Sequence, residues 1–269
     1  MQPMTTIALR AARKAGEIIA RATEQVDLLD VSEKGVNDFV TEIDTAAEKE
    51  VIYHISKAHP DHGFLGEEGG QQGNPDSDYQ WIIDPLDGTT NFIRGIPHFA
   101  VSIACLYKGQ LEHAVILDPI RREEFISSRG RGAQLNGHRI RVSSRKSLDG
   151  ALIGTGIPYK ARSENHIPAY MQSLEAVTKQ TAGIRRAGSA ALDLAYVAAG
   201  RLDAFWEIGL NRWDIAAGAL LIREAGGLIG DFSGGNAYLE SGNIVAGNPK
   251  CFKAILQTVQ PYLGKIQAK

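Results

Sequence analysis

The sequence has little that would tie a chain to an oxidising compartment or a membrane. It contains two cysteines, Cys105 and Cys251, far apart and each among apolar neighbours, so we expect two buried, reduced thiols. No CxxC pair and no Cys/His spacing typical of structural zinc occurs. No apolar run is long enough to span a bilayer, and the N-terminus lacks the apolar core of a signal peptide. We therefore expect a cytoplasmic protein without a membrane partner.

An excess of one charge is also lacking. The 29 Lys and Arg residues nearly balance the 31 Asp and Glu residues, giving a formal net charge of -2. This balance does not indicate a nucleic-acid or anionic-membrane partner. Internal repeats and low-complexity tracts are absent from the sequence as well. The 269 residues, 43% of them hydrophobic, can bury a sizeable core as one large α/β unit or as two intimate halves.

Hydrophobic periodicity predicts two N-terminal helices, over about residues 6–25 and 37–59. In the second helix, Asp44 falls on the apolar stripe, between Val40 and Ala47. A carboxylate on a buried helix face needs a partner, because its burial alone is costly. Asp44 is therefore a candidate functional residue, although a face that is only partly buried there would explain it as well.

The rest of the chain reads as strands and helices separated by turn signals. This mixture predicts an α/β layered sandwich. We expect an N-terminal α+β half, 1–142, which carries the metal-binding motifs, and a C-terminal α/β half, 143–269, which completes the active site of one compact catalytic unit. The predicted strands are 81–83, 100–106, 112–117, 124–127, 151–154, 204–207 and 244–246, and the predicted helices are 167–179, 190–199, 214–225 and 250–260.

One segment in the first half combines a strand end with two carboxylates. The apolar strand 81–83 is expected to end at Asp84, because Pro85 should prevent its continuation. Asp87 follows three residues after Asp84. Gly88 then permits a tight turn. The strand exit therefore presents two aspartates immediately before a change of chain direction.

This arrangement suits hard cations and phosphate together. Asp84 and Asp87 offer oxygen ligands of the kind magnesium prefers, and the Leu86 carbonyl lies between them. Residues 89–91 read as the start of a helix, whose free backbone N–H groups attract phosphate. An ordinary turn and an ordinary helix cap explain the same residues, so the segment alone leaves metal binding and a structural role equally open.

Further carboxylates favour metal binding. Glu67 and Glu68 lie in a glycine-flanked loop after a short strand, and Glu207 follows an apolar strand. Asp214 opens a helix of mostly apolar residues. Taken singly, an aspartate at a helix start is usually a cap and a carboxylate at a strand end is usually solvated. Their number, more than any one of them, indicates a cation site.

Three motifs resemble the inositol monophosphatase family in order and spacing. They are Gly-Glu-Glu at 66–68, the run from Trp to Phe at 81–92, and Trp-Asp-Ile-Ala-Ala-Gly at 213–218. The segment 185–200 is similar to the bacterial extragenic-suppressor branch, and the resemblance covers nearly the whole chain. It implies a five-layer αβαβα sugar-phosphatase fold, a homodimer and inhibition by lithium.

The resemblance also implies a metal site holding two or three Mg²⁺ ions. Glu67 would bind the metal that activates the attacking water, and Asp84 would bridge metals. The Leu86 carbonyl would be a further ligand, and Asp87 and Asp214 would complete a second site. The sequence has no Cys-x5-Arg loop, and its Asp-x-Asp at residues 76–78 lies in a polar loop. Neither motif supports a covalent phosphoenzyme, so direct attack by water is expected.

Catalytic and substrate-binding residues are implied in the same way. Thr89 would hold and polarise the attacking water, with Asp44 as its partner. The Gly88 and Thr89 amides would hold the phosphate, and Lys34 would be a nearby charge. The other implied substrate contacts are Asp87, Arg185, Ser189, Ala190, Glu207 and Asp214, of which Arg185 could equally be a surface charge.

The expected function is magnesium-dependent hydrolysis of inositol 1-phosphate and related polyol phosphates by metal-activated water. Fructose-1,6-bisphosphatase, histidinol phosphatase and nucleotide 3′-phosphatase share the metal architecture and remain alternatives. A different class is also open: an accessory binding factor in ribosomal RNA transcription antitermination, independent of catalysis. Its partners would be RNA polymerase or antitermination factors.

Overall fold

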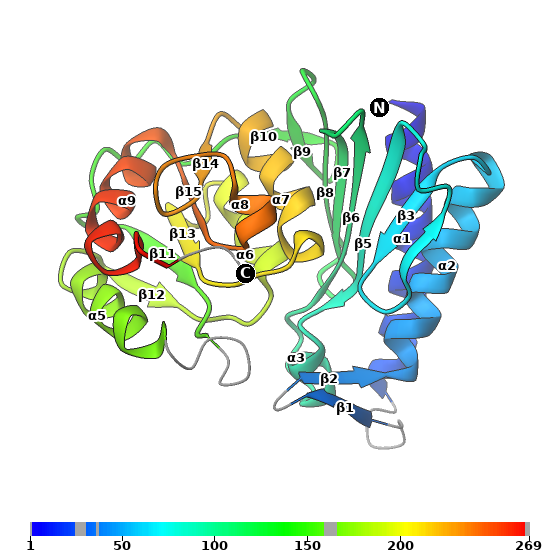
Figure 1. Cartoon of the computed structure of the whole chain (residues 1–269), viewed down its shortest axis with the longest axis horizontal. Helices are drawn as coiled ribbons and strands as arrows, with labels where there is room; N and C mark the ends of the chain where they lie inside the picture. Colours follow the sequence, from blue (N-terminus) through cyan, green and yellow to red (C-terminus); the bar gives the residue numbers. More distant parts are fainter. Residues whose placement is uncertain (1, 25–30, 36–37, 159–165, 267–269) are drawn as a thin grey trace.

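The chain folds into five layers, with helices and sheets in alternation (Figure 1). The computed structural model describes residues 2–24, 31–35, 38–158 and 166–266, without the side chains of residues 31–41. Helices α1 and α2 cover an eight-stranded sheet, α6 and α7 lie between the two sheets, and α5 and α9 cover the other side of a five-stranded sheet. The predicted αβαβα arrangement is confirmed. These helices are α1 Pro3–Ala22, α2 Glu42–Ala58, α5 Ile167–Thr178, α6 Ala190–Ala198, α7 Arg212–Glu224 and α9 Pro249–Leu263.

The larger sheet has the strand order β10-β9-β8-β7-β6-β5-β3-β4. All neighbouring pairs are antiparallel except β3 and β5. Asn136 and Gly137 join β9 to β10 with φ of 49° and 80°, as a two-residue hairpin turn requires. The strands are β3 Gly63–Gly66, β4 Gly70–Gly73, β5 Tyr79–Asp87, β6 Ala100–Tyr107, β7 Gln110–Asp118, β8 Glu123–Ser128, β9 Ala133–Leu135 and β10 His138–Ile140.

The smaller sheet has the order β12-β11-β13-β15-β14. Strand β11 runs parallel to both of its neighbours, and β15 runs antiparallel to β13 and β14. Free Cys105 and Cys251 are buried, one in β6 and one in α9, as expected. The strands are β11 Leu152–Thr155, β12 Gly183–Arg185, β13 Ala204–Glu207, β14 Leu228–Gly230 and β15 Ile244–Gly247, and a short helix, α8, spans Tyr238–Ser241.

Helix α2 begins later than predicted. The expected helix start near residue 37 is wrong, because Asp38–Thr41 forms strand β2, which pairs antiparallel with β1, Val31–Gly35. Backbone pairing with a neighbouring segment outweighs a local helical pattern, and periodicity within one segment cannot reveal it. Val40 is therefore not part of the helix stripe. Asp44 is buried in the first turn of α2, on the face that also buries Ala47.

Strand β5 also continues past its expected end. Asp84 pairs with Ser102 and Asp87 with Ala100, so one extra residue is accommodated between the two aspartates. Pro85 lies in this irregular stretch, and β-bulges are among the few places in a sheet that tolerate proline. The local kink re-aims the two aspartates without ending the strand. Helix α3, Thr89–Ile93, follows directly, as predicted.

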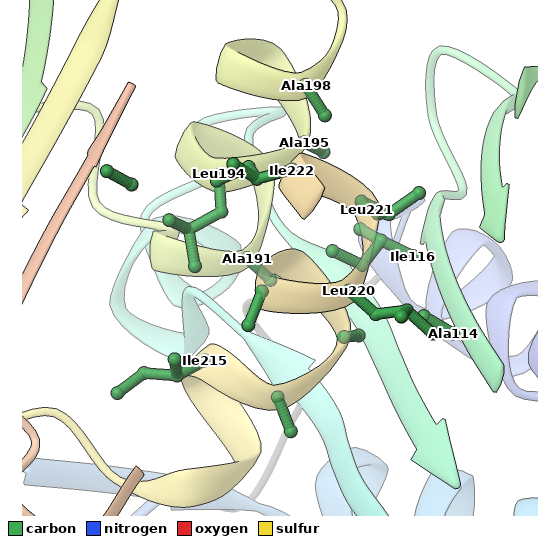
Figure 2. Packing of buried hydrophobic residues seen from close by; sticks show 14 of the residues in the cluster. Ala114, Ile116, Ala191, Leu194, Ala195, Ala198, Ile215, Leu220, Leu221 and Ile222 are labelled. Atoms are coloured by element: carbon green, nitrogen blue, oxygen red, sulfur yellow. The ribbon is translucent and has the colours of Figure 1, made fainter. Parts of the chain in front are cut away.

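Helices α6 and α7 form the middle layer, and small residues let them pack closely (Figure 2). Ala191 and Ala195 belong to the same buried cluster as Leu220, which lies near Ala114 of β7. A Cβ on Gly218 of α7 would overlap the Leu194 side chain of α6, so this position must be glycine for the observed approach. The close packing places the N-terminal ends of α6 and α7 beside the end of β5.

Candidate functional site

Three carboxylates from two distant elements meet at the end of β5. Asp84 and Asp87 come from β5 and Asp214 from the first turn of α7, and one oxygen of each lies within 4.8 Å of the others. Ser102 Oγ donates to the Trp213 carbonyl at 3.2 Å. Because Ser102 is the register partner of Asp84, this bond holds the start of α7 against β5. The two halves of the chain therefore build the cluster together.

Asp214 has a structural role as well as its place in the cluster. Helix α7 begins at Arg212, two residues before its predicted start, with Asn211 as its N-cap. The Asn211 backbone N–H donates to Asp214 Oδ2 at 2.6 Å, the geometry of a capping box. This bond fixes the direction of the carboxylate. Asp214 is thus both a helix-capping residue and a member of the carboxylate cluster.

Asp87 is held by the N-terminal end of α6. Its Oδ2 accepts from Ser189 Oγ at 2.6 Å and from the Ala191 backbone N–H at 2.7 Å. Ser189 also caps α6, because its Oγ accepts from Leu192 N at 3.3 Å. Ser189 is buried, so its hydroxyl lies beneath Asp87 as a support. Ala190, the adjacent predicted contact, is buried at the first position of the same helix.

Burial, and then mutual repulsion, raise the pKa values of Asp84 and Asp87. For Asp84, loss of hydration and then the charges of Glu67, Asp87 and Asp214 raise the pKa well above 3.8. Burial and the charge of Asp214 raise the pKa of Asp87 to about 7, against the opposing effect of the Ser189 and Ala191 hydrogen bonds. The three neighbouring charges that raise the pKa of Asp84 are all negative. Their mutual repulsion therefore disfavours a fully ionised cluster.

The cluster fits a hard divalent cation. All of its donors are carboxylate oxygens, the ligand type that magnesium and calcium prefer. A bound cation would offset the repulsion among the carboxyl groups and would return them to their ionised form. The donor set and this mutual repulsion together indicate a metal site.

Thr89 connects the strand end to α2. Its Oγ1 lies 3.0 Å from Asp44 Oδ1 and 3.0 Å from the Leu86 carbonyl, both of which can only accept. Asp44 is 1% exposed and lies in the first turn of α2, where the helix dipole stabilises its charge. Gly88 has a φ of 100°, and a Cβ there would lie 3.0 Å from the His98 carbonyl, so only glycine fits this turn.

Glu67 reaches the cluster from the turn between β3 and β4. A hydrogen bond joins its side chain to Asp84, and its backbone N–H donates to the Ile83 carbonyl at 3.1 Å. Buried Glu48 of α2 accepts the N–H groups of Glu68 and Gly69 at 2.9 Å and 2.8 Å. Glu48 therefore holds the loop that presents Glu67.

Glu48 was not among the site residues predicted from the sequence, although its spacing from Asp44 could have indicated it. It lies four residues after Asp44, so a helix places both carboxylates on the same face. A second carboxylate on a buried stripe strengthens the same functional argument that singled out Asp44. Lys34, expected nearby, belongs to β1, but its side chain lies outside the described part of the structure.

Glu207 lies at the end of β13, on the side of the site that faces the smaller sheet. Burial and then the charge of Asp193 raise its pKa well above 4.5, whereas Arg186 acts in the opposite direction. Arg185 is exposed, and its guanidinium donates to the Ile184 carbonyl at 3.1 Å. Of these two arginines, Arg186 is the one whose positive charge acts on Glu207. Neither Arg186 nor Asp193 was singled out from the sequence.

The layered fold with a carboxylate cluster at the end of β5 defines a protein of the sugar-phosphatase fold. The sequence model of the inositol monophosphatase family matches residues 1–263, and the chain belongs to this family. Membership places the chain among phosphatases. Within the described residues, no helix is both long and apolar enough to cross a bilayer.

Named relatives lie in the extragenic-suppressor branch, as the sequence indicated. Nus factor SuhB of Pseudomonas aeruginosa is 62% identical over 265 residues, and Nus factor SuhB of Escherichia coli K12 is 54% identical over 263; each match covers 98% of both chains. The crystal structure of extragenic suppressor protein suhB from Bartonella henselae has a TM-score of 0.93 at 44% identity, covering 96% of this chain and 98% of that one. Inositol monophosphatase from Anabaena sp. PCC 7120 has a TM-score of 0.85 at 37% identity, covering 96% and 95%.

Replacing Glu48 should weaken the binding of Mg²⁺. Glu48→Gln keeps the size of the side chain but replaces one accepting oxygen with an NH₂ group that cannot accept from a backbone N–H. We expect the affinity for Mg²⁺ to fall about tenfold to a hundredfold, the range for residues that support metal ligands. Calorimetric titration with Mg²⁺ measures this. Glu50→Gln is the control, since Glu50 lies on the same helix and pairs with His54 at 2.9 Å; equal affinity of both variants would contradict the assigned role.

Magnesium should stabilise the protein more at high pH than at low pH. The metal-free folded protein keeps a proton on Asp87 up to about pH 7, whereas the unfolded chain loses it near the ordinary value of 3.8. The contribution of Asp87 to stability therefore falls as the pH rises through this window. Because Mg²⁺ binds the ionised carboxylate, the Mg²⁺-induced rise in Tm should be larger at about pH 8 than at about pH 5.5. Scanning calorimetry tests this, and an equal rise at both pH values in wild type would refute it.

Proposed function

We propose that this protein hydrolyses inositol 1-phosphate and related polyol phosphates to the free alcohol and phosphate, with Mg²⁺ as cofactor. The observation that carries the proposal is the cluster of Asp84, Asp87 and Asp214 beside the Thr89–Asp44 pair. The carboxylate cluster provides a cation site, and the Thr89–Asp44 pair provides a hydroxyl group at the edge of that site. Membership of the inositol monophosphatase family supports the same activity.

Two or three Mg²⁺ ions would be held by the Leu86 carbonyl and by the carboxylates of Glu67, Asp84, Asp87 and Asp214. When bound, magnesium supplies positive charge for the phosphoryl group and an activated water as the nucleophile. The protein keeps these ligands in place through Glu48, Ser189 and the Asn211 backbone. Such support matters, because a carboxylate cluster that is free to relax would move its members apart.

Thr89 and Asp44 would handle the proton of the attacking water. While Thr89 Oγ1 donates to Asp44, its lone pairs can accept a hydrogen bond from water. The buried Asp44 carboxylate makes the Thr89 oxygen a better acceptor, because a charge-assisted hydrogen bond polarises the hydroxyl group. The pair therefore orients the water for attack on phosphorus and draws its proton away.

The attacking water and the leaving alcohol would lie on opposite sides of the phosphorus atom. The backbone N–H groups of Gly88 and Thr89 would hold the phosphate oxygens. Glu207 would accept a hydrogen bond from a substrate hydroxyl group, and Ala190 would line the same pocket. Ser189 and Arg185 complete the proposed substrate site, with Ser189 acting through Asp87. The proposal also includes a cytoplasmic homodimer that lithium inhibits.

Phosphate release tests the activity directly. Purified protein should release phosphate from inositol 1-phosphate with Mg²⁺, release none with EDTA, and release less when lithium is added to Mg²⁺. Asp84→Asn should lower kcat about a hundredfold or more, because it removes a ligand charge at the centre of the cluster. Its circular dichroism spectrum should be unchanged.

The matched control is Glu175→Gln, an exposed carboxylate that pairs with Lys179 at 2.6 Å on the surface of α5. It should leave kcat unchanged. Near-normal activity of Asp84→Asn would overturn the metal assignment. Release from fructose 1,6-bisphosphate, histidinol phosphate or adenosine 3′,5′-bisphosphate, but not from inositol 1-phosphate, would replace the substrate and leave the reaction type in place.

We also propose a second role, as an accessory factor in ribosomal RNA transcription antitermination. The supporting observation is that relatives 54% and 62% identical over nearly the whole chain are called Nus factor SuhB. The partners would be RNA polymerase or other antitermination factors. Exposed cations of α1 and the exposed Arg185 and Arg186 are candidate contact residues. This role does not require hydrolysis.

A metal-site variant separates the two roles in a cell. In a bacterial strain that lacks its own copy of this protein, Asp84→Asn should restore readthrough of a ribosomal RNA terminator reporter as well as wild type does. The reason is that Asp84 is 1% exposed, so its replacement leaves the surface unchanged. If the variant accumulates to the wild-type level but does not restore readthrough, the cellular role depends on an intact metal site.

A further inference from the structure

Asp193 is a buried carboxylate whose side chain has no role in the site described so far. It lies in the first turn of α6 and is 2% exposed. Among the described residues, no group donates a hydrogen bond to its carboxylate. A buried carboxyl group without a donor is costly, and a partner that donated hydrogen bonds to it would remove that cost.

The neighbour of Asp193 is Glu207. A Cβ on Gly154 of β11 would lie 3.5 Å from Asp193 Cγ, and a Cβ on Gly156 would overlap the Glu207 carboxylate. Residues two apart along an extended chain project to the same side. The Glu207 carboxyl group therefore occupies the space that a side chain at position 156 would fill, and the Asp193 carboxyl group lies at van der Waals distance from position 154, on the same side of the chain.

This carboxyl pair is close to the metal cluster. The charge of Asp87 acts on both Asp193 and Glu207, and the charge of Asp214 acts on Glu207. Asp193 lies two residues after Ala191, whose N–H holds Asp87. On the other side, the positive charge of Arg186 reaches both members of the pair. The pair thus lies where the alcohol part of a bound phosphate ester would be, beside the phosphoryl site.

We propose that Asp193 is a specificity-determining residue that, together with Glu207, accepts hydrogen bonds from two neighbouring hydroxyl groups of the leaving alcohol. This inference rests on the proposed phosphatase function. Two adjacent carboxyl groups match a vicinal diol, because each hydroxyl group donates one hydrogen bond. An ester without such hydroxyl groups leaves the pair unsatisfied, and sites built to hydrogen-bond a hydroxyl discriminate strongly against analogues that lack it.

The test compares two substrates in Asp193→Asn. The variant should raise the KM for inositol 1-phosphate about tenfold, because the NH₂ group that replaces one carboxyl oxygen cannot accept a hydrogen bond from a substrate hydroxyl group. The KM and kcat for p-nitrophenyl phosphate, which has no hydroxyl groups on its leaving group, should not change. The Tm should not fall, because the carboxylate gives up no hydrogen bond within the described protein.

Asp203→Asn is the matched control for a buried aspartate with a structural role. Asp203 is 7% exposed and accepts from Ser143 Oγ at 2.6 Å and from the Leu152 N–H at 2.8 Å. Its variant should lower the Tm and leave the ratio of kcat/KM for the two substrates unchanged. Asp193→Asn should show the opposite pattern.

The outcomes separate this inference from the proposed function. If Asp193→Asn lowers kcat/KM equally for both substrates, Asp193 only supports α6 or Asp87, and the inference is overturned while the phosphatase stands. If wild type hydrolyses neither substrate, the phosphatase proposal fails. Calorimetric titration with inositol 1-phosphate then tests whether Asp193 contributes to binding of the alcohol. About tenfold weaker binding by the variant would then support the role of Asp193, and equal affinity, or no binding to wild type, would overturn it.

Discussion

Repulsion among Asp84, Asp87 and Asp214 is the constraint on which the rest of the structure depends. Three carboxylates with oxygens within 4.8 Å of one another oppose folding unless each is held from outside the cluster. The structure gives each one its own backbone donor: Leu86 N for Asp84, Ala191 N for Asp87 and Asn211 N for Asp214. These bonds fix the directions of the carboxylates and leave their charge to be neutralised by a cation.

One of these donors also joins segments far apart in the chain. The Ala191 N–H belongs to α6 and holds Asp87 at the end of β5. Asn91 adds a neutral link, since its Nδ2 donates to the His98 carbonyl at 2.7 Å and to the Ala187 carbonyl at 2.9 Å. A site assembled across two sheets in this way is completed only when the middle helices dock, which is why close packing of α6 and α7 matters for the site as well as for stability.

Most helices and strands were predictable because local patterns agree with tertiary packing there. Strands β11, β13 and β15 and the helices α5, α6 and α9 occur close to their expected residues, and Asn136-Gly137 forms its hairpin turn, whereas β12 and β14 were not predicted. Two predictions were wrong because tertiary structure overrides the local pattern. Residues 38–41 pair with β1 instead of extending α2, and β5 passes through Pro85 by means of a bulge. The division into halves at residues 142 and 143 stays a prediction.

The sequence by itself determined the layered fold class, the family and the carboxylates that take part in the cluster, because these depend on motifs and periodicity within short segments. It singled out Asp44 through its place on an apolar stripe. Only the tertiary structure decided which groups hold those carboxylates: Glu48 on the Glu67 loop, Ser189 on Asp87, and Asp193 beside Glu207. It also showed that the charge of Arg186 acts on Glu207, whereas the Arg185 guanidinium donates to the carbonyl of the preceding residue, Ile184. Contacts between residues far apart in sequence depend on how layers pack, and no local pattern encodes that geometry.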